Sequence, residues 1–274
     1  MVAPGGPSVV PRRMRLDAEL VRRGLVRSRE HAADLITEGR VTVSGQVALK
    51  AATAVAADTA LVVRPLREGP DYVSRGAQKL AGALDVLPVR VQGRRCLDAG
   101  ASTGGFTDVL LRRGALEVLA VDVGYGLIAW SLRTDVRVTV MDRRNVRHLG
   151  VEDIGTPVDL ITTDLSFISL ALVLPALTGL VVGGGDLFLM VKPQFEVGRD
   201  RIGKGGVVRD PLLRCAAVES VGAAAARLGW GVAGVTASSL PGPAGNVEYF
   251  LWLRSDAPPL DGDDVRRAVE NGPK

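Results

Sequence analysis

The sequence predicts an α/β protein in which a Rossmann-like, doubly wound sheet follows a small N-terminal α+β module. Three observations carry this prediction. Short aliphatic runs alternate with helical segments over most of the chain, as in parallel sheets with helices on both faces. A glycine-rich loop at residues 100–105 joins the first of these runs to a helix. The chain is 47% hydrophobic but only 4% aromatic, which suits an aliphatic core between layers.

The composition along the chain predicts four parts. Residues 1–11 are rich in Pro and Gly and are expected to be disordered. Residues 12–66 are expected to form the small module. Residues 67–74 are polar and contain a proline, which predicts a linker. Residues 75–270 are then expected to form the larger domain.

The small module has clear helix and turn signals. An apolar stripe from Leu16 ends at Gly24, and a second helix begins after the capping residue Ser28 and ends at Gly39. A short alternating strand then leads into a Ser-Gly hairpin turn at residues 44–45.

The larger domain should begin with a helix over residues 76–87 and continue with alternating strands and helices. Asp210 and Pro211 are a good cap and first-turn pair for a helix that ends near Gly229. The expected strands cover residues 95–98, 118–122, 136–141, 160–164, 187–192, 231–237 and 247–253.

Residues 165–185 carry no charge, and this length alone would suffice for a membrane span. Pro175, several hydroxyl side chains and three closing glycines argue against a span and for a buried helix that leads into a strand. No secretory signal is visible. We therefore expect no membrane partner and a cytoplasmic location.

Cysteine and histidine are scarce. Cys96 and Cys215 lie in apolar runs without a pairing pattern, and His31 and His148 are the only histidines. This argues against a disulfide scaffold, a metal site and a Ser-His-Asp or Cys-His hydrolase.

The glycine loop points to a nucleotide cofactor. Its pattern is D-x-G-x-x-x-G-G, whereas a dinucleotide fingerprint requires G-x-G-x-x-G, so S-adenosylmethionine is favoured over a nicotinamide. Asp98, Asp122 and Asp142 stand at successive strand ends, where adenosine hydroxyls need acceptors. Each feature alone is common in α/β proteins. The residues expected to bind the cofactor are Asp98, Gly100, Ala101, Ser102, Thr103, Gly104, Gly105, Phe106, Thr107, Asp122, Val123, Asp142 and Asp164. The fold class is thus a class I S-adenosylmethionine-dependent methyltransferase sheet.

Four charged residues stand near the same sheet edge and are the catalytic candidates: Lys79, Asp164, Lys192 and Glu248. Lys192 is the expected base for a ribose hydroxyl, or steers that hydroxyl if it stays charged. Lys79 would lower the proton affinity of Lys192. The carboxylates of Asp164 and Glu248 would position both lysine side chains and the attacking oxygen. The alternative is that Lys79 and Glu248 are ordinary surface charges and that Asp164 and Lys192 form a structural ion pair.

Other methyl acceptors have less support. Methylation of an exocyclic amine usually needs a D-P-P-Y-like tetrad, but residues 164–167 read D-L-S-F. Methylation of a pyrimidine carbon needs a thiolate at the site, and neither cysteine is suitably placed.

The front module is basic, since residues 12–79 carry 13 Lys and Arg against 8 Asp and Glu. Guanidinium groups suit phosphate oxygens, although a solvated helix face would look similar. The candidate RNA-binding residues are Arg12, Arg13, Arg15, Arg22, Arg23, Arg27 and Arg29.

Two resemblances follow from these motifs. The front module resembles the alpha-L RNA-binding module through residues 15–17, 24–25, 28–29, 32, 35–36, 39–41 and 45. Nearly the whole chain resembles the TlyA family, hemolysin-like ribosomal RNA 2'-O-methyltransferases related to the FtsJ-type enzymes. The resemblance rests on residues 74–80, 98–107, 121–126, 164–169, 191–196 and 245–250.

The resemblance implies methylation of cytidine ribose in 16S or 23S ribosomal RNA, or in both, with sensitivity to capreomycin-type antibiotics as a consequence. The family's Lys-Asp-Lys-Glu tetrad falls on the four catalytic candidates. The long basic front favours both subunits as partners of a monomeric enzyme. The rival hypotheses are a hemolysin or pore-forming protein, a small-molecule methyltransferase, and a ribosome-binding factor without catalysis.

Overall fold

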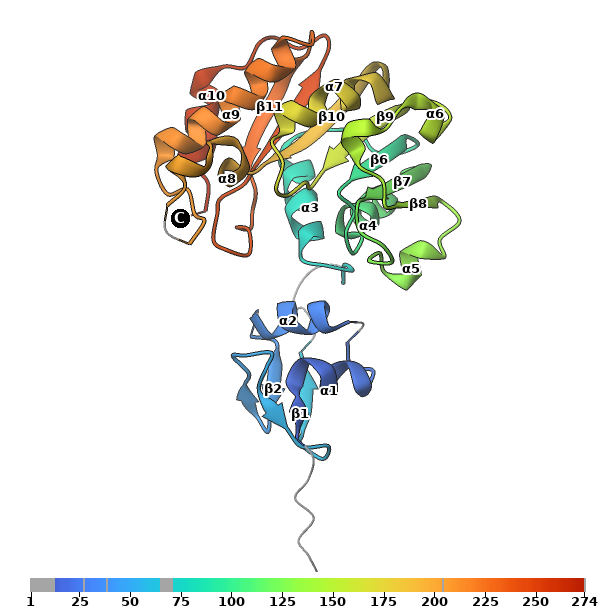
Figure 1. Ribbon diagram of the computed structural model, residues 1–274, viewed down its shortest axis with the longest axis vertical. Coiled ribbons are helices and arrows are strands. Elements are labelled where there is room, and N and C mark those ends of the chain that lie inside the picture. Colours follow the sequence, from blue (N-terminus) through green and yellow to red (C-terminus); the bar gives the residue numbers. More distant parts are fainter. Residues whose placement is uncertain (1–12, 27, 38, 65–70, 204, 274) are drawn as a thin grey trace, which may run out of the picture. The chain divides into compact units, whose positions relative to one another are not determined.

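The computed structural model describes residues 13–26, 28–37, 39–64, 71–203 and 205–273 (Figure 1). The chain divides into two compact units, Met1–Asp71 and Tyr72–Lys274, here called the front unit and the larger unit. The division falls within the segment 67–74 that was expected to be a linker. The segment 1–11, expected to be disordered, lies outside the described residues.

The front unit folds two helices against small antiparallel sheets, of two strands in the order β1-β4 and three in the order β3-β2-β5. Their shared core includes Leu16, Leu20 and Leu35. The predicted cap is confirmed, because the backbone N–H of His31 donates to Ser28 Oγ at 3.1 Å. The elements are β1 (Met14–Arg15), α1 (Leu16–Arg22), α2 (Arg29–Thr37), β2 (Val41–Val43), β3 (Gln46–Val47), β4 (Ala54–Val55) and β5 (Leu61–Val63).

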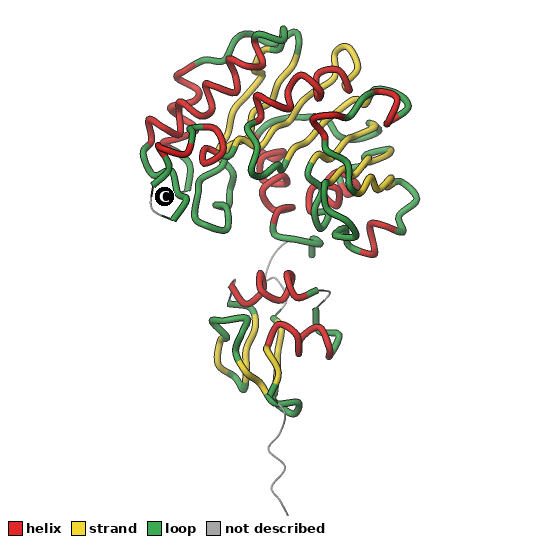
Figure 2. Tube along the Cα trace, viewed as in Figure 1, coloured by secondary structure: helices red, strands yellow, loops and turns green. Residues whose placement is uncertain are grey.

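The larger unit is built on a seven-stranded sheet in the order β11-β12-β10-β9-β6-β7-β8. Figure 2 shows strands in yellow and helices in red. The predicted doubly wound class is confirmed: the strands from β10 to β8 are parallel, and β12 and β11 add an antiparallel edge. The strands are β6 (Arg95–Ala99), β7 (Glu117–Asp122), β8 (Val138–Asp142), β9 (Val158–Thr163), β10 (Val181–Val191), β11 (Gly231–Ala237) and β12 (Tyr249–Arg254).

Helices cover both faces of this sheet. One face packs against α3, α4 and α5, and the other against α7, α9 and α10. Asp210 caps α9 as predicted, since its carboxylate accepts a hydrogen bond from the N–H of Leu212 at 2.9 Å. The helical segments are α3 (Gly76–Val86), α4 (Gly105–Arg112), α5 (Trp130–Arg133), η1 (Val146–His148), α6 (Val151–Ile154), α7 (Leu170–Leu180), α8 (Pro193–Glu196), η2 (Arg199–Arg201), α9 (Pro211–Ala226) and α10 (Gly262–Glu270).

The uncharged stretch differs in detail from its prediction. The helix α7 runs through Pro175, and β10 begins at Val181, six residues before the predicted start at residue 187. The three glycines at residues 183–185 lie inside β10, where its pairing with β9 is irregular between Val181 and Asp186. Among the described residues, no helix combines the length and apolarity that a membrane crossing requires.

Strand register brings the chemistry to one edge of the sheet. Because β12 runs antiparallel to β10, its first residue, Tyr249, lies opposite the last residue of β10, Val191. The end of the neighbouring strand β9 lies at the same edge. Lys192, Glu248 and Asp164 each adjoin one of these strand ends, so three of the four catalytic candidates gather there.

Candidate active site

The glycine loop after β6 passes close to the end of β9. Gly100 has φ of +88°, and a Cβ there would lie 2.7 Å from the carbonyl oxygen of Asp164. Only glycine adopts this conformation without strain and leaves room for the neighbouring backbone. The loop can therefore border a cleft without filling it.

A cleft of about 400 Å³ opens beside this loop, within the usual range for small-molecule sites. Five of the residues expected to bind the cofactor line it: Gly100, Ser102, Asp122, Val123 and Asp164. The Asp122 carboxylate accepts hydrogen bonds from the N–H groups of Ser102 at 2.8 Å and Gly124 at 2.7 Å. These bonds fix the carboxylate at the strand end with acceptor capacity to spare.

The other residues predicted to bind the cofactor do not line the cleft, and several of them contact neighbouring parts of the fold instead. Phe106 packs against Phe250 with ring centroids 6.0 Å apart. Asp142 forms an ion pair with Arg133 at 2.7 Å and accepts a hydrogen bond from the N–H of Gly126. These residues are Asp98, Ala101, Thr103, Gly104, Gly105, Phe106, Thr107 and Asp142.

Asp98 is fully buried beneath the loop. Thr107 Oγ1 donates to its Oδ2 at 2.7 Å, and its Oδ1 has no hydrogen-bond partner in the described part of the chain. Burial raises the pKa of Asp98 to about 7, with smaller contributions from Asp164 and Asp122, because desolvation penalises the charged carboxylate.

The four catalytic candidates form two ion pairs. Lys79 Nζ lies 2.6 Å from Glu248 Oε2, and Lys192 Nζ lies 2.6 Å from Asp164 Oδ1. Both lysines and Glu248 are buried, whereas Asp164 is partly exposed in the cleft. Buried lysines without carboxylate partners would be strongly destabilising, so the alternating charges stabilise each other.

The two ion pairs lie near the same helix. A Cβ at Gly76 would be 3.7 Å from Asp164 Oδ2, and Lys79 lies three residues further along α3. Since positions three apart share a helix face, the N-terminal turn of α3 faces both pairs. Of the four candidates, Asp164 lines the cleft and Lys192 contacts two lining residues, Asp164 and Ser166, whereas Lys79 and Glu248 are not part of the lining.

Sequence reasoning missed several residues of this site. Arg144 and Asn145 line the cleft from the loop after β8. Ser166 also lines it, and its Oγ accepts a hydrogen bond from Lys192 Nζ at 2.9 Å. Phe167 is 91% exposed with φ of +65°, and its ring centroid lies 5.2 Å from that of Phe195. The D-L-S-F run was the available signal, but only its aspartate was assigned.

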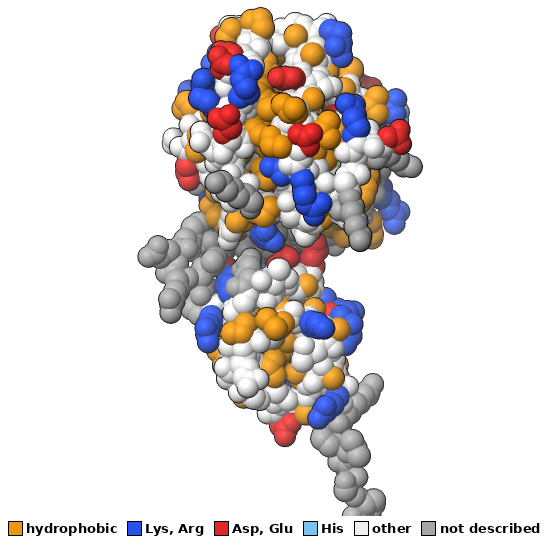
Figure 3. Space-filling model, turned by 90° about the vertical axis from the view of Figure 1, so that its left-hand side faces the viewer, with side chains coloured by type: hydrophobic (Ala, Val, Ile, Leu, Met, Phe, Trp, Pro, Cys, Tyr) orange, Lys and Arg blue, Asp and Glu red, His pale blue; other side chains and the backbone are white. Residues whose placement is uncertain are grey.

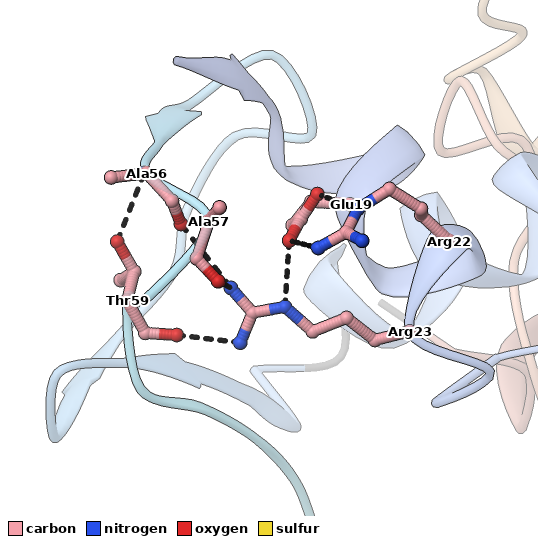
Figure 4. Close-up of polar contacts among 6 residues, drawn as sticks. All are labelled: Glu19, Arg22, Arg23, Ala56, Ala57 and Thr59. Atoms are coloured by element: carbon pink, nitrogen blue, oxygen red, sulfur yellow. Dashed lines mark hydrogen bonds and ion pairs between the residues drawn. The ribbon is translucent and has the colours of Figure 1, made fainter. Parts of the chain in front are cut away.

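The predicted RNA-binding arginines of the front unit fall into different groups. Arg23 is 22% exposed and bonds Glu19 and the carbonyl oxygens of Ala56, Ala57 and Thr59 (Figure 4). Arg22 also pairs with Glu19 but is 52% exposed.

Arg15 and Arg29 both pair with Asp17 and remain largely exposed, as does Arg13. Arg12 and Arg27 lie outside the described residues. Figure 3 shows Lys and Arg side chains at the surface of the front unit. The exposed guanidinium groups are available to phosphate oxygens, whereas Arg23 is mainly used inside the fold.

Two family models match the chain. The model described as FtsJ-like methyltransferase matches residues 72–255, and the S4 domain model matches residues 14–60. The matches correspond closely to the two units of the structure.

Curated relatives and a solved structure are also similar. The chain is 58% identical over 268 residues to the 16S/23S rRNA (cytidine-2'-O)-methyltransferase TlyA of Mycobacterium tuberculosis, covering 96% of this chain and 99% of that protein. It is 38% identical to the 23S rRNA (cytidine-2'-O)-methyltransferase TlyA of Campylobacter jejuni, covering 66% and 70%. A structure described as a hemolysin from Streptococcus thermophilus has 37% identity and a TM-score of 0.76, covering 96% of each chain.

Proposed function

Because the chain belongs to the FtsJ-like methyltransferase family and has the S4 module and sequence of the TlyA type, we propose that it methylates the ribose 2'-oxygen of cytidine in ribosomal RNA. The resemblance expected from the motifs is confirmed by these matches. The observation that carries the proposal is the double ion pair, Lys79–Glu248 and Lys192–Asp164, beside the cleft.

The cleft suits S-adenosylmethionine. The fixed Asp122 carboxylate offers acceptors to ribose hydroxyls, and the backbone at Gly100 can approach a ligand closely because no side chain intervenes. Val123 and Leu127 add apolar surface suited to an adenine ring. When bound, the cofactor supplies an electrophilic methyl group on a sulfonium sulfur.

The charged residues would prepare the ribose oxygen. A hydroxyl must lose its proton as its oxygen forms a bond to the methyl carbon and the carbon–sulfur bond breaks. We assign that proton to Lys192 Nζ in its neutral form; an amine that stays charged would instead orient the hydroxyl. Asp164 and Ser166 hold this amine in place through contacts of 2.6 and 2.9 Å. Glu248 holds Lys79 in the same way. In this assignment the Lys79–Glu248 ion pair orients the attacking ribose oxygen.

The substrate we propose is cytidine in both 16S and 23S ribosomal RNA. The similarity to the M. tuberculosis protein, whose name gives both RNAs, extends over 96% of this chain, whereas the similarity to the 23S enzyme of C. jejuni covers 66%. The S4 module with its exposed arginines would supply sequence-independent affinity for RNA phosphates. We expect a monomer that acts in the cytoplasm and confers capreomycin-type sensitivity.

The alternative of a hemolysin has less support. A structural relative is described as a hemolysin, but the relative with 58% identity is named a methyltransferase. The buried charges beside the cleft have no role in a pore. A ribosome-binding factor without catalysis would also leave the two ion pairs unexplained.

The proposal is tested by transfer of labelled methyl from S-adenosylmethionine to ribosomal subunits from a host that lacks the modification. Wild-type protein should label cytidine riboses on both subunits, mapped by ribose-methylation-sensitive primer extension. Lys192→Ala should lower the rate by roughly 10²- to 10⁴-fold, the usual contribution of a proton-transfer group.

Arg90→Ala is a matched control, because it removes an exposed cation of the larger unit outside the cleft lining. It should leave the rate unchanged. Absence of label with wild-type protein would refute catalysis and favour the binding factor. Lysis of erythrocytes that persists in Lys192→Ala would instead favour the hemolysin.

A further inference from the structure

Asn246 is buried beside the site, and both ends of its side-chain amide form hydrogen bonds. The residue is 2% exposed. Its Oδ1 accepts from the N–H of Val208 at 2.9 Å, and its Nδ2 donates to the carbonyl oxygen of Gly206 at 2.8 Å. One partner needs an acceptor and the other a donor. An aspartate of the same size only accepts, so it could satisfy one partner and not the other.

The segment that Asn246 holds is itself attached to the fold. Val208 is buried and packs with Val197 and Ala217. Its carbonyl oxygen accepts a hydrogen bond from Arg214 Nε at 2.9 Å. The segment 206–208 is therefore a fixed anchor between α8 and α9.

On the other side, Asn246 belongs to the turn that precedes β12. The N–H of Gly242 donates to the carbonyl oxygen of Asn246 at 2.8 Å, and the N–H of Gly245 donates to the carbonyl oxygen of Gly242 at 2.9 Å. A Cβ at Gly242 would lie 2.6 Å from Glu248 Oε1. The Glu248 carboxylate thus rests against this turn while its other oxygen meets Lys79.

We propose that Asn246 is a positioning residue that fixes the turn 242–246 to the segment 206–208 and thereby holds Glu248 in contact with Lys79. This inference rests on the proposed function and adds a residue that acts through Glu248, without contact to either substrate. Without the two amide bonds, the turn would lose the hydrogen bonds that join it to this anchor, and Glu248 could shift away from the amine.

The first test compares Asn246→Ala and Asn246→Asp with wild type in methyl transfer to ribosomal subunits. Asn246→Ala removes both bonds and should lower kcat by roughly 10- to 100-fold, as expected when a catalytic group is displaced by about 1 Å. The KM for S-adenosylmethionine should stay within about twofold, because Asn246 does not line the cleft. Asn246→Asp keeps the bond from Val208 but turns an acceptor toward the Gly206 carbonyl oxygen, so its kcat should also fall below that of wild type.

Asp210→Ala is the matched control. It removes the cap of α9 just after the same segment. Among the described residues no hydrogen bond joins Asp210 to the turn 242–246, so the variant should leave kcat unchanged even if it lowers stability. An equal loss of kcat in Asp210→Ala would overturn the positioning role and indicate general destabilisation.

A double-mutant cycle with Glu248→Ala provides the second test. If Asn246 acts through Glu248, adding Asn246→Ala to Glu248→Ala should cause no further loss of rate. Losses that multiply would overturn the inference, as would a wild-type kcat in Asn246→Ala. Both results leave the proposed function intact, whereas absence of transfer by wild-type protein would refute that function itself.

Discussion

Asp98 shows how a single buried carboxyl couples stability to pH. Its pKa is raised from 3.8 to about 7 by burial, so between these values the folded chain keeps a proton that the unfolded chain has lost. The free energy of unfolding should then fall as pH rises through this window, by about 1.4 kcal/mol per pH unit from this group. Above pH 7 its contribution should be constant.

We predict that Asp98→Asn removes this slope, because an amide oxygen can still accept the Thr107 hydrogen bond but does not titrate. Urea unfolding at pH 5, 6 and 7 would measure it. The difference in stability between variant and wild type should change in the variant's favour as pH rises. A difference that is the same at all three pH values would contradict the prediction.

Phe167 is the second residue with a distinct expectation. Its exposed aromatic side chain lines the cleft and contacts the ring of Phe195, so it offers a stacking surface to an unstacked base. Since stacking contributes about 1–3 kcal/mol per base, Phe167→Ala should raise the KM for ribosomal subunits by roughly tenfold.

The Phe167→Tyr variant should retain the wild-type KM because its ring can also stack. Leu172→Ala is a suitable control, since Leu172 is an exposed apolar residue on α7 that does not line the cleft. An equal increase in KM for this control would argue against stacking.

At the scale of elements, α1 depends on one arginine more than on its neighbour. Arg23 ties the C-terminal end of α1 to residues 56–59 through three carbonyl oxygens and also pairs with Glu19, whereas Arg22, among the described residues, pairs with Glu19 only (Figure 4). We predict that Arg23→Ala lowers the melting temperature of the front unit by several degrees and that Arg22→Ala lowers it less.

RNA binding separates the two arginines in the opposite direction. Arg22→Ala should weaken RNA binding more than Arg23→Ala, because Arg22 has the more exposed guanidinium. Filter binding at several salt concentrations would measure this. Equal melting temperatures for Arg22→Ala and Arg23→Ala would contradict the structural role.

Element boundaries were predictable where a local residue sets them. Ser28 and Asp210 cap helices because their side chains bond nearby N–H groups, and these interactions span only two or three residues. The start of β10 was predicted too late. Its glycine-containing first half is extended by pairing with β9 at Val158, a partner more than twenty residues away that no local pattern reveals.

At the scale of the whole molecule, each unit has its own hydrophobic core. We predict that residues 72–274 alone bind S-adenosylmethionine with wild-type affinity but methylate ribosomal subunits poorly. The front unit would supply the electrostatic affinity for RNA, which weakens steeply with salt. Calorimetry with the cofactor and methyl transfer at two salt concentrations would measure these properties. Equal transfer by full-length and truncated chains would refute the division of roles.

The sequence by itself determined the fold class, the two-part organisation and the four charged candidates. These depend on strand periodicity, glycine spacing and motifs, all of which are local properties of the chain. The tertiary structure decided which charges pair, which arginines are engaged within the front unit, and that Asp98 lies beneath the loop without lining the cleft. It also revealed Asn246 between two loops. Such properties depend on contacts between residues distant in the chain, and strand register and side-chain burial arise only when the sheet is assembled.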